Sequence, residues 1–256
     1  MIDSHCHLEF KHFDGDREEV IDKAKDRIKA VVNSSAEINK ARDVIRLHRE
    51  HKEFIFPSLG LHPKRALEAS DDELENFKRI IKERRNDIVA IGEVGLDHAQ
   101  VRDPRKRKRC KEIFADFIKL SNDLDLPVVV HARKAMDETL RILKKHKEGD
   151  VVIHCFAGNI KHLRDALEEG YYISLGGIIF RSQKKYERII DVLPHENLLL
   201  ETDAPFLAKK KSDRSEPWFI WDVAERVAEV KGRNFKKVWE SAGENAKKVF
   251  DLPIDI

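Results

Sequence analysis

The chain has 256 residues, of which 41% are hydrophobic and 38% are charged, so it can bury one large core beneath a densely ionic surface. No stretch approaches the roughly 18 consecutive apolar residues that a membrane helix needs. The opening residues MIDSHCHLEF also lack the basic and apolar regions of a signal peptide. A net charge of +2 is too close to zero to argue by itself for nucleic-acid binding. We therefore expect a soluble, cytoplasmic protein with a single domain over residues 1–256 and no membrane contact.

Short apolar runs alternate along the chain with longer segments of helical periodicity, a pattern typical of βα units. The predicted strands are Ile2–His7, Ile28–Ser34, Ile55–His62, Ile88–Asp97, Pro127–Ala132, Val151–Phe156, Tyr171–Gly177 and Leu198–Asp203. Charged amphipathic segments between them predict helices, for example Glu37–His51, Asp72–Arg85, Arg105–Leu124 and Ala135–Lys147. Several strands are continuously apolar, as expected of strands buried on both faces. Eight such units predict an α/β fold, the (β/α)₈ TIM barrel.

The alternative fold is an open, doubly wound sheet. That fold normally carries a glycine-rich phosphate loop with G-x-G-x-x-G spacing after its first strand. Here the first strand ends in His5-Cys6-His7, and no such loop follows. The sequence therefore favours the closed barrel.

His5 and His7 lie two residues apart at the end of the first predicted strand, so both imidazoles should face the barrel interior. A buried His-x-His pair needs partners, and a divalent cation supplies one for each ring. Two core histidines that hydrogen-bond to their neighbours would give the same pattern. Taken alone, the pair does not decide between these interpretations.

Further ionisable residues stand at the ends of other predicted strands. The same barrel rim should carry His62, Glu93, Asp97, His131, His154 and Asp203. In α/β barrels, active sites lie at this carboxyl-terminal rim. So many histidines and carboxylates at one rim indicate a metal site better than chance placement does.

Four histidines and two or three carboxylates exceed what one tetrahedral zinc ion requires, and they suit two divalent ions. Glu93 stands midway round the barrel between the two groups of histidines, which makes it the candidate bridge. Asp203 follows the last strand, next to the first once the barrel closes, so it can reach the His5/His7 ion. It can also accept a proton from a nucleophilic water. The ions could be Zn, Mg or Mn, because this mixture of ligands does not select one of them.

Six segments, in order over nearly the whole chain, resemble the motifs of the TatD-type metal-dependent deoxyribonucleases. They are His5-Cys6-His7-Leu8, Gly60-Leu61-His62-Pro63, Gly92-Glu93-Val94-Gly95-Leu96-Asp97, Leu126-Pro127 with His131-Ala132-Arg133, His154-Cys155-Phe156-Ala157-Gly158, and Glu201-Thr202-Asp203-Ala204-Pro205. Any one of these motifs would be weak evidence, but together they are highly specific.

The resemblance implies an amidohydrolase-type barrel that hydrolyses phosphodiesters of DNA with two divalent ions, one candidate mode being 3′–5′ exonuclease action on single strands. One ion would be held by His5, His7, Glu93 and Asp203, and the other by Glu93, His131 and His154. The catalytic residues would be Asp203, Glu93 and His62. His62 and Arg133 would bind the substrate phosphate, Arg133 as a planar donor. An arginine paired with a carboxylate at the strand end is the alternative for Arg133.

Two other functions remain open from the sequence: hydrolysis of a different ester or amide, and a nucleic-acid-binding module that uses metal only as a structural clamp. The basic segments Arg102–Lys111 and Lys209–Arg214 mildly favour a polyanionic substrate, although such runs are usually solvated surface. No obligatory protein partner is implied, which is consistent with a monomer. By strand alternation, Cys6 and Cys155 should point into the helix layer and pack there. Glu201 should share the inward face with Asp203 and orient metal ligands.

Overall fold

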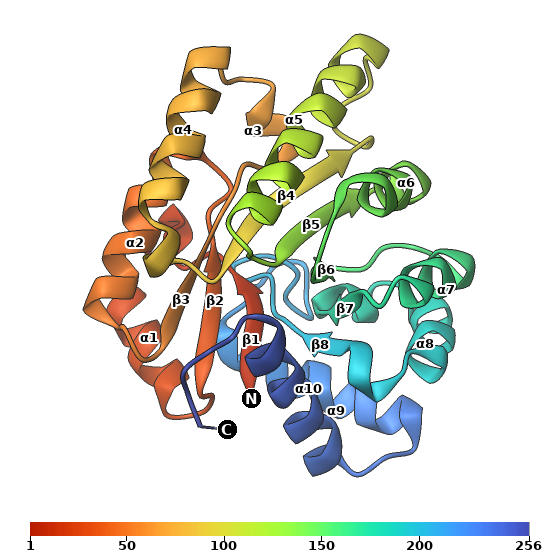
Figure 1. Ribbon diagram of the computed structural model, residues 1–256. Helices are drawn as coiled ribbons and strands as arrows, with labels where there is room; N and C mark the ends of the chain where they lie inside the picture. Colours follow the sequence, from red (N-terminus) through yellow and green to blue (C-terminus); the bar gives the residue numbers. More distant parts are fainter. Residues whose placement is uncertain (256) are drawn as a thin grey trace.

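The computed structural model describes residues 1–255. Within them, eight parallel strands follow one another round a single sheet in sequence order, and helices surround the sheet, which confirms the predicted (β/α)₈ barrel (Figure 1). The strands are β1 (Ile2–Cys6), β2 (Ala30–Ser34), β3 (Ile55–Leu59), β4 (Ala90–Asp97), β5 (Val128–Arg133), β6 (Val151–Ile153), β7 (Tyr172–Leu175) and β8 (Leu198–Leu200).

The α-helices are α1 (Arg17–Lys25), α2 (Ala41–Glu50), α3 (Pro63–Ala66), α4 (Asp71–Glu83), α5 (Pro104–Asp123), α6 (Met136–His146), α7 (Ile160–Glu168), α8 (Gln183–Val192), α9 (Ile220–Lys231) and α10 (Phe235–Val249). Short 3-10 helices occupy Lys11–Phe13, Ile38–Lys40, Arg85–Asp87, Gly177–Phe180, His195–Asn197 and Pro217–Phe219. None of the helices in residues 1–255 is long and apolar enough to cross a membrane.

Local signals in the sequence account for where several helices begin. Ser70 forms a capping box with Glu73 at the start of α4, which satisfies two backbone N–H groups that have no partner within the helix. Asp103 caps α5 by accepting from the backbone N–H groups of Arg105 and Lys106, and Pro104 fills the first helical position. Each helix then buries its apolar side against the sheet.

Apolar side chains fill the barrel in an inner layer that is separate from the layer between sheet and helices. Each strand contributes to the inner layer, for example through Ile2, Phe56, Val129 and Leu199. The end of α10 adds Val249 and Phe250 to this layer, together with Leu252 just beyond it. α10 lies at the end of the barrel where the chain begins (Figure 1). The opposite end, where the strands finish, remains open to hold a site.

Backbone hydrogen bonds close the barrel between its first and last strands. The N–H of Asp203 donates to the carbonyl of His5 at 3.0 Å, and the N–H of His7 donates to the carbonyl of Ala204 at 2.7 Å. Below them, the buried carboxylate of Asp3 accepts from the Thr202 N–H at 2.9 Å and from its hydroxyl at 2.5 Å. This seam therefore includes the backbone of three predicted metal ligands, namely His5, His7 and Asp203.

The predicted strands are correct in number and order, and β4 ends at Asp97 as predicted, but several others are predicted too long at their carboxyl ends. β3 stops at Leu59 instead of His62, β6 at Ile153 instead of Phe156, and β8 at Leu200 instead of Asp203. Cys155 and Asp203 have left-handed backbone conformations, with φ of 45° and 56°, which a strand does not accommodate. His7, His62, His154 and Asp203 therefore stand just beyond their strands, whereas His5, Glu93, Asp97 and His131 lie within β1, β4 and β5.

Candidate metal centre

An irregularity in β1 directs both of its histidines toward the open end of the barrel. Ile2 packs in the inner layer and Cys6 in the outer layer, although strict alternation would place both on the same side. The register with β2 shifts between Asp3 and Cys6, which resolves this conflict. His5 and His7 then lie on one side, as predicted, and both are buried.

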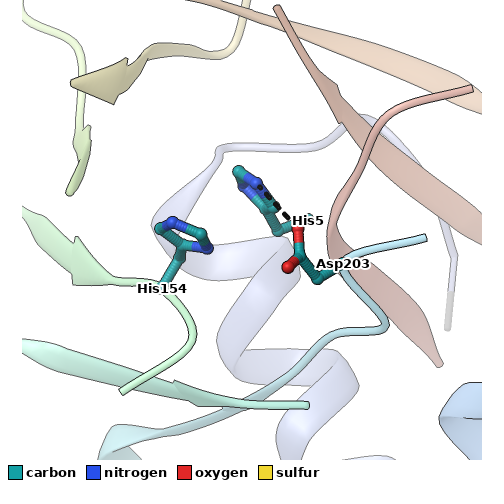
Figure 2. A group of neighbouring side chains, drawn as sticks. All are labelled: His5, His154 and Asp203. Carbon is teal, nitrogen blue, oxygen red and sulfur yellow. Dashed lines mark ion pairs between the residues drawn. The ribbon is translucent and has the colours of Figure 1, made fainter. Parts of the chain in front are cut away.

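The first group of side chains joins β1 to the ends of β4 and β8. The Nε2 atoms of His5 and His7 lie 3.2 Å apart. Asp203 Oδ1 is 3.4 Å from His7 Nε2 and 3.9 Å from His5 Nε2, and Glu93 Oε2 is 3.8 Å from His5 Nε2. Figure 2 shows Asp203, His5 and His154 pointing toward one another. His154 stands at the edge of the second group, because its ring stacks on that of His5 with centroids 4.0 Å apart.

The second group is centred on the same carboxylate of Glu93. Its Oε2 is 2.9 Å from His154 Nε2 and 3.6 Å from His131 Nδ1, and these two ring nitrogens are 3.2 Å apart. Glu93 therefore lies between the two pairs of histidines, the place that a bridging ligand requires. The structure brings together all six residues that were predicted to hold metal.

The donor set fits divalent cations. Two pairs of imidazole nitrogens face each other at 3.2 Å around a buried carboxylate, and cations would satisfy these converging lone pairs. Burial, together with the nearby His154 and His7, holds the pKa of His5 well below its usual range, which leaves that ring neutral. Although burial opposes ionisation of Glu93, hydrogen bonds with His131 and His154 hold its pKa well below the usual range. Neutral imidazole and ionised carboxylate are the forms that bind metal, so a bound cation would displace the protons on His7, His131 and His154, whose pKa values are raised, despite burial, by neighbouring carboxylates.

The outer nitrogens of His5 and His7 are held by hydrogen-bond partners, whereas that of His154 faces a carboxylate beyond hydrogen-bond distance. His7 Nδ1 is 2.7 Å from the carbonyl oxygen of Ser34, and His5 Nδ1 is 3.2 Å from the hydroxyl of the same serine. His154 Nδ1 lies 3.7 Å from the buried carboxylate of Glu201, on the inward face where Glu201 was expected. Such partners fix the tautomer and the orientation of a metal-binding ring.

Asp97 is the partner of His131, a role that the sequence alone did not assign. Its Oδ2 lies 3.4 Å from His131 Nε2, the nitrogen that faces away from Glu93. The N–H groups of Ala99 and Gln100 donate to its Oδ1 at 2.8 and 2.9 Å, and the Gln100 side chain donates to Oδ2 at 2.8 Å. The signal was present, because Asp97 follows Glu93 at a spacing of four on the same face of β4.

His62 and Arg133 stand on the wall of a cavity of about 540 Å³ that opens above the ligands. His62 Nδ1 accepts from the N–H of Lys64 at 3.2 Å, and its Nε2 lies 4.0 Å from Asp97 Oδ2. Burial lowers the pKa of His62 to about 4. The Arg133 side chain is 59% exposed and reaches Asp97 only at 4.0 Å, so it is not held in a close ion pair.

The two cysteines beside metal ligands differ in position. Cys6 packs in the layer between sheet and helices, as expected. The prediction for Cys155 was wrong, because this residue lines the cavity. β6 ends at Ile153, so strand alternation does not extend to Cys155, and its N–H donates to Glu201 Oε1 at 2.7 Å.

A family model described as TatD related DNase matches residues 2–251. The chain belongs to the TatD family. The order of the six motifs along the chain predicts this membership. The barrel brings the ionisable residues of those motifs together at one rim.

Individual TatD relatives match over nearly full length. The Bacillus subtilis protein YabD, described as an uncharacterized metal-dependent hydrolase, is 33% identical over 98% of this chain and 99% of its own. Human deoxyribonuclease TATDN3 is 33% identical over 98% of this chain and 94% of its own. The crystal structure of YjjV, a TatD homologue from Escherichia coli K12, superposes with a TM-score of 0.90 at 28% identity, covering 99% and 98% of the two chains. The chain is thus a TatD-family metal-dependent hydrolase.

Proposed function

We propose that this protein is a deoxyribonuclease that hydrolyses phosphodiester bonds with two divalent ions. The observation that carries the proposal is the pair of histidine groups that share Glu93 at the floor of an open cavity. The name of the human relative, a deoxyribonuclease, supports DNA as the substrate.

The side chains divide between two ion positions that share one carboxylate. His5, His7, Glu93 and Asp203 would hold one ion, and Glu93, His131 and His154 would hold the other. When bound, the two ions would supply a water of lowered pKa and positive charge against the phosphate oxygens.

Three further roles fall to residues at the cavity. The Asp203 carboxylate is 15% exposed and would accept the proton of the attacking water. Because His62 Nδ1 accepts from a backbone N–H, the neutral ring carries its proton on Nε2 and would donate to a phosphate oxygen. Arg133, exposed beside it, would contribute a planar pair of N–H donors.

A purely structural metal clamp is the weaker candidate, because structural sites are closed whereas these ligands line an open cavity. Hydrolysis of a non-nucleic ester or amide would use the same metal ligands. The exposed basic residues Lys64 and Arg133 at the cavity favour a phosphodiester over such neutral substrates.

The test begins with protein from which a chelator has removed all metal, and this protein is reloaded with Mn²⁺, Mg²⁺ or Zn²⁺ in turn. Oligonucleotides labelled at either end, in single- and double-stranded form, report cleavage and distinguish exonuclease from endonuclease products. We expect metal-dependent cleavage and two ions per chain by elemental analysis. Cleavage of p-nitrophenyl acetate or an N-acetyl amide without cleavage of DNA would overturn the proposal. The absence of bound metal after reloading with excess metal would also overturn it.

A further inference from the structure

The cavity above the metal centre has two chemically different walls. One wall carries the basic residues Lys64 and Arg133, together with Arg65, which is paired with Glu37 and Glu68. The other is apolar and carries Phe10, Ile178 and Phe206. A substrate with an anionic part and a flat apolar part would match both walls at once. A nucleotide unit of DNA has this composition.

Phe206 dominates the apolar wall because its side chain remains open to solvent. The residue is 41% exposed, among the most exposed large hydrophobic residues in the described chain. Its ring meets Phe10 edge-on, with centroids 5.7 Å apart, and Phe10 in turn stacks on the metal-binding ring of His7 at 4.9 Å. An aromatic surface therefore extends from the metal centre to solvent.

A backbone hydrogen bond links Phe206 to Asp203, the proposed general base. The N–H of Phe206 donates to the carbonyl of Asp203 at 2.8 Å, which closes a tight turn. The position of the ring is thus tied to that of the reacting phosphate. A base stacked on Phe206 would belong to a nucleotide next to the scissile bond.

Further contacts hold the segment that carries Phe206. Arg181 donates to the carbonyls of Ala208 and Lys209 at 2.5 and 3.2 Å. The N–H of Ser215 donates to the Pro205 carbonyl at 3.0 Å. Gly177 lies so close to the Leu207 carbonyl that a Cβ would collide with it. A surface fixed in this way loses little entropy when a ligand binds.

We propose that Phe206, backed by Phe10, stacks against a nucleobase that flanks the scissile phosphate. This inference rests on the proposed deoxyribonuclease function and names the subsite that the function requires. Every base has an apolar face, so the contact is independent of sequence. Removal of one stacked base corresponds to a change of roughly 5- to 150-fold in affinity.

The experiment compares Phe206→Ala, Phe206→Trp and the unchanged enzyme on two single-stranded oligonucleotides at saturating metal. One oligonucleotide is intact, and the other carries a tetrahydrofuran abasic residue at each nucleotide flanking the scissile bond. Trp221→Ala is the control, because Trp221 is 53% exposed but lies on α9 and does not line the cavity. Circular dichroism and metal content verify that each variant is folded and loaded.

We expect Phe206→Ala to raise KM about 10-fold on the intact oligonucleotide, with little effect on the abasic one. Phe206→Trp should retain the affinity, and Trp221→Ala should match the unchanged enzyme. An equal loss on both oligonucleotides, or no loss on either, would overturn the stacking role while leaving DNA cleavage intact. If Phe206→Ala instead changed the oligomeric state by light scattering, the ring would belong to a protein contact, which also overturns the proposal. Failure of the unchanged enzyme to cleave either oligonucleotide would reject the proposed function itself.

Discussion

At the scale of single residues, Asp203 combines two tasks that one substitution can separate. It lies 3.4 Å from His7, where it would contact an ion, and it lines the cavity proposed to bind substrate. Asparagine keeps one oxygen for coordination but does not accept a proton at neutral pH. We expect Asp203→Asn to lower kcat by about 10²–10⁴-fold while the His131/His154 ion remains bound.

Glu93→Gln is the matched comparison, since the shared carboxylate contacts both pairs of histidines. This variant should lose affinity for both ions, whereas Asp203→Asn should weaken only the one near His5 and His7. Metal content and turnover measured side by side distinguish the two patterns. Near-normal turnover of Asp203→Asn at saturating metal would move the general base to another residue.

Asp97 provides a second prediction, because it contacts His131 at Nε2, the ring nitrogen that faces away from Glu93. We expect Asp97→Asn to weaken binding of the His131/His154 ion by about 10–100-fold, and excess metal should recover much of the activity. Asp137→Asn, an exposed aspartate on α6, serves as the control. Isothermal titration with Zn²⁺ or Mn²⁺ gives the affinity directly. Unchanged affinity in Asp97→Asn would show that His131 is oriented by other contacts.

At the scale of secondary-structure elements, β4 and β5 approach each other so closely that only glycine fits at position 95. Gly95 has a φ of 146°, and a Cβ there would overlap the carbonyl oxygen of His131. We expect Gly95→Ala to cost about 1–3 kcal/mol of unfolding free energy and to reduce metal affinity, because His131 must move. Gly170→Ala, at a φ of 75° but with no atom nearby, is the control for backbone strain alone. Thermal unfolding and metal titration should separate the two variants, and equal losses would contradict a displacement of His131.

The strands and their order could be predicted from the sequence, whereas several strand ends could not. Apolar runs such as Val128–Val130 predicted the strands and their order, because burial on both faces leaves a clear pattern. The strand ends were predicted poorly, since the chain leaves the sheet through turns at Cys155 and Asp203 that hydrophobic periodicity does not encode. For the same reason strand alternation wrongly predicts that Cys155 points into the helix layer instead of the cavity. The role of Asp97 as the partner of His131 could not be predicted, because it depends on a contact between two strands.

At the scale of the whole molecule, several basic residues of Arg102–Lys111 and Lys209–Arg214 already form ion pairs within the protein. In α5, Arg109 pairs with Asp71 and Lys111 with Glu138. In the loop after β8, Arg214 holds both oxygens of Asp16 at 2.6 and 2.8 Å. Arg214 therefore anchors this loop to the segment after β1, and only the other basic residues of Lys209–Arg214 are candidates for contact with a phosphate.

Lys210 and Lys211 are exposed lysines of that loop that form no ion pair within residues 1–255, whereas the exposed Lys209 pairs with Asp222. If DNA passes over this rim, replacing both with glutamine should flatten the dependence of log(kcat/KM) on log salt, by about 0.7 for each phosphate that is no longer neutralised. Lys236→Gln with Lys237→Gln, on the exposed side of α10, is the control. An unchanged salt slope for the loop variant would assign Lys210 and Lys211 to solvated surface.

The seam between β1 and β8 gives metal binding a consequence for folding. Residues 5 and 203 meet there through a backbone hydrogen bond and through side chains 3.9 Å apart. An ion held by both residues would act as a reversible cross-link that encloses residues 5–203. Only the folded barrel offers this pair of ligands, so each increase in free metal would stabilise it by mass action. The first and last strands would thus be fastened together by the same ions that equip the barrel for hydrolysis.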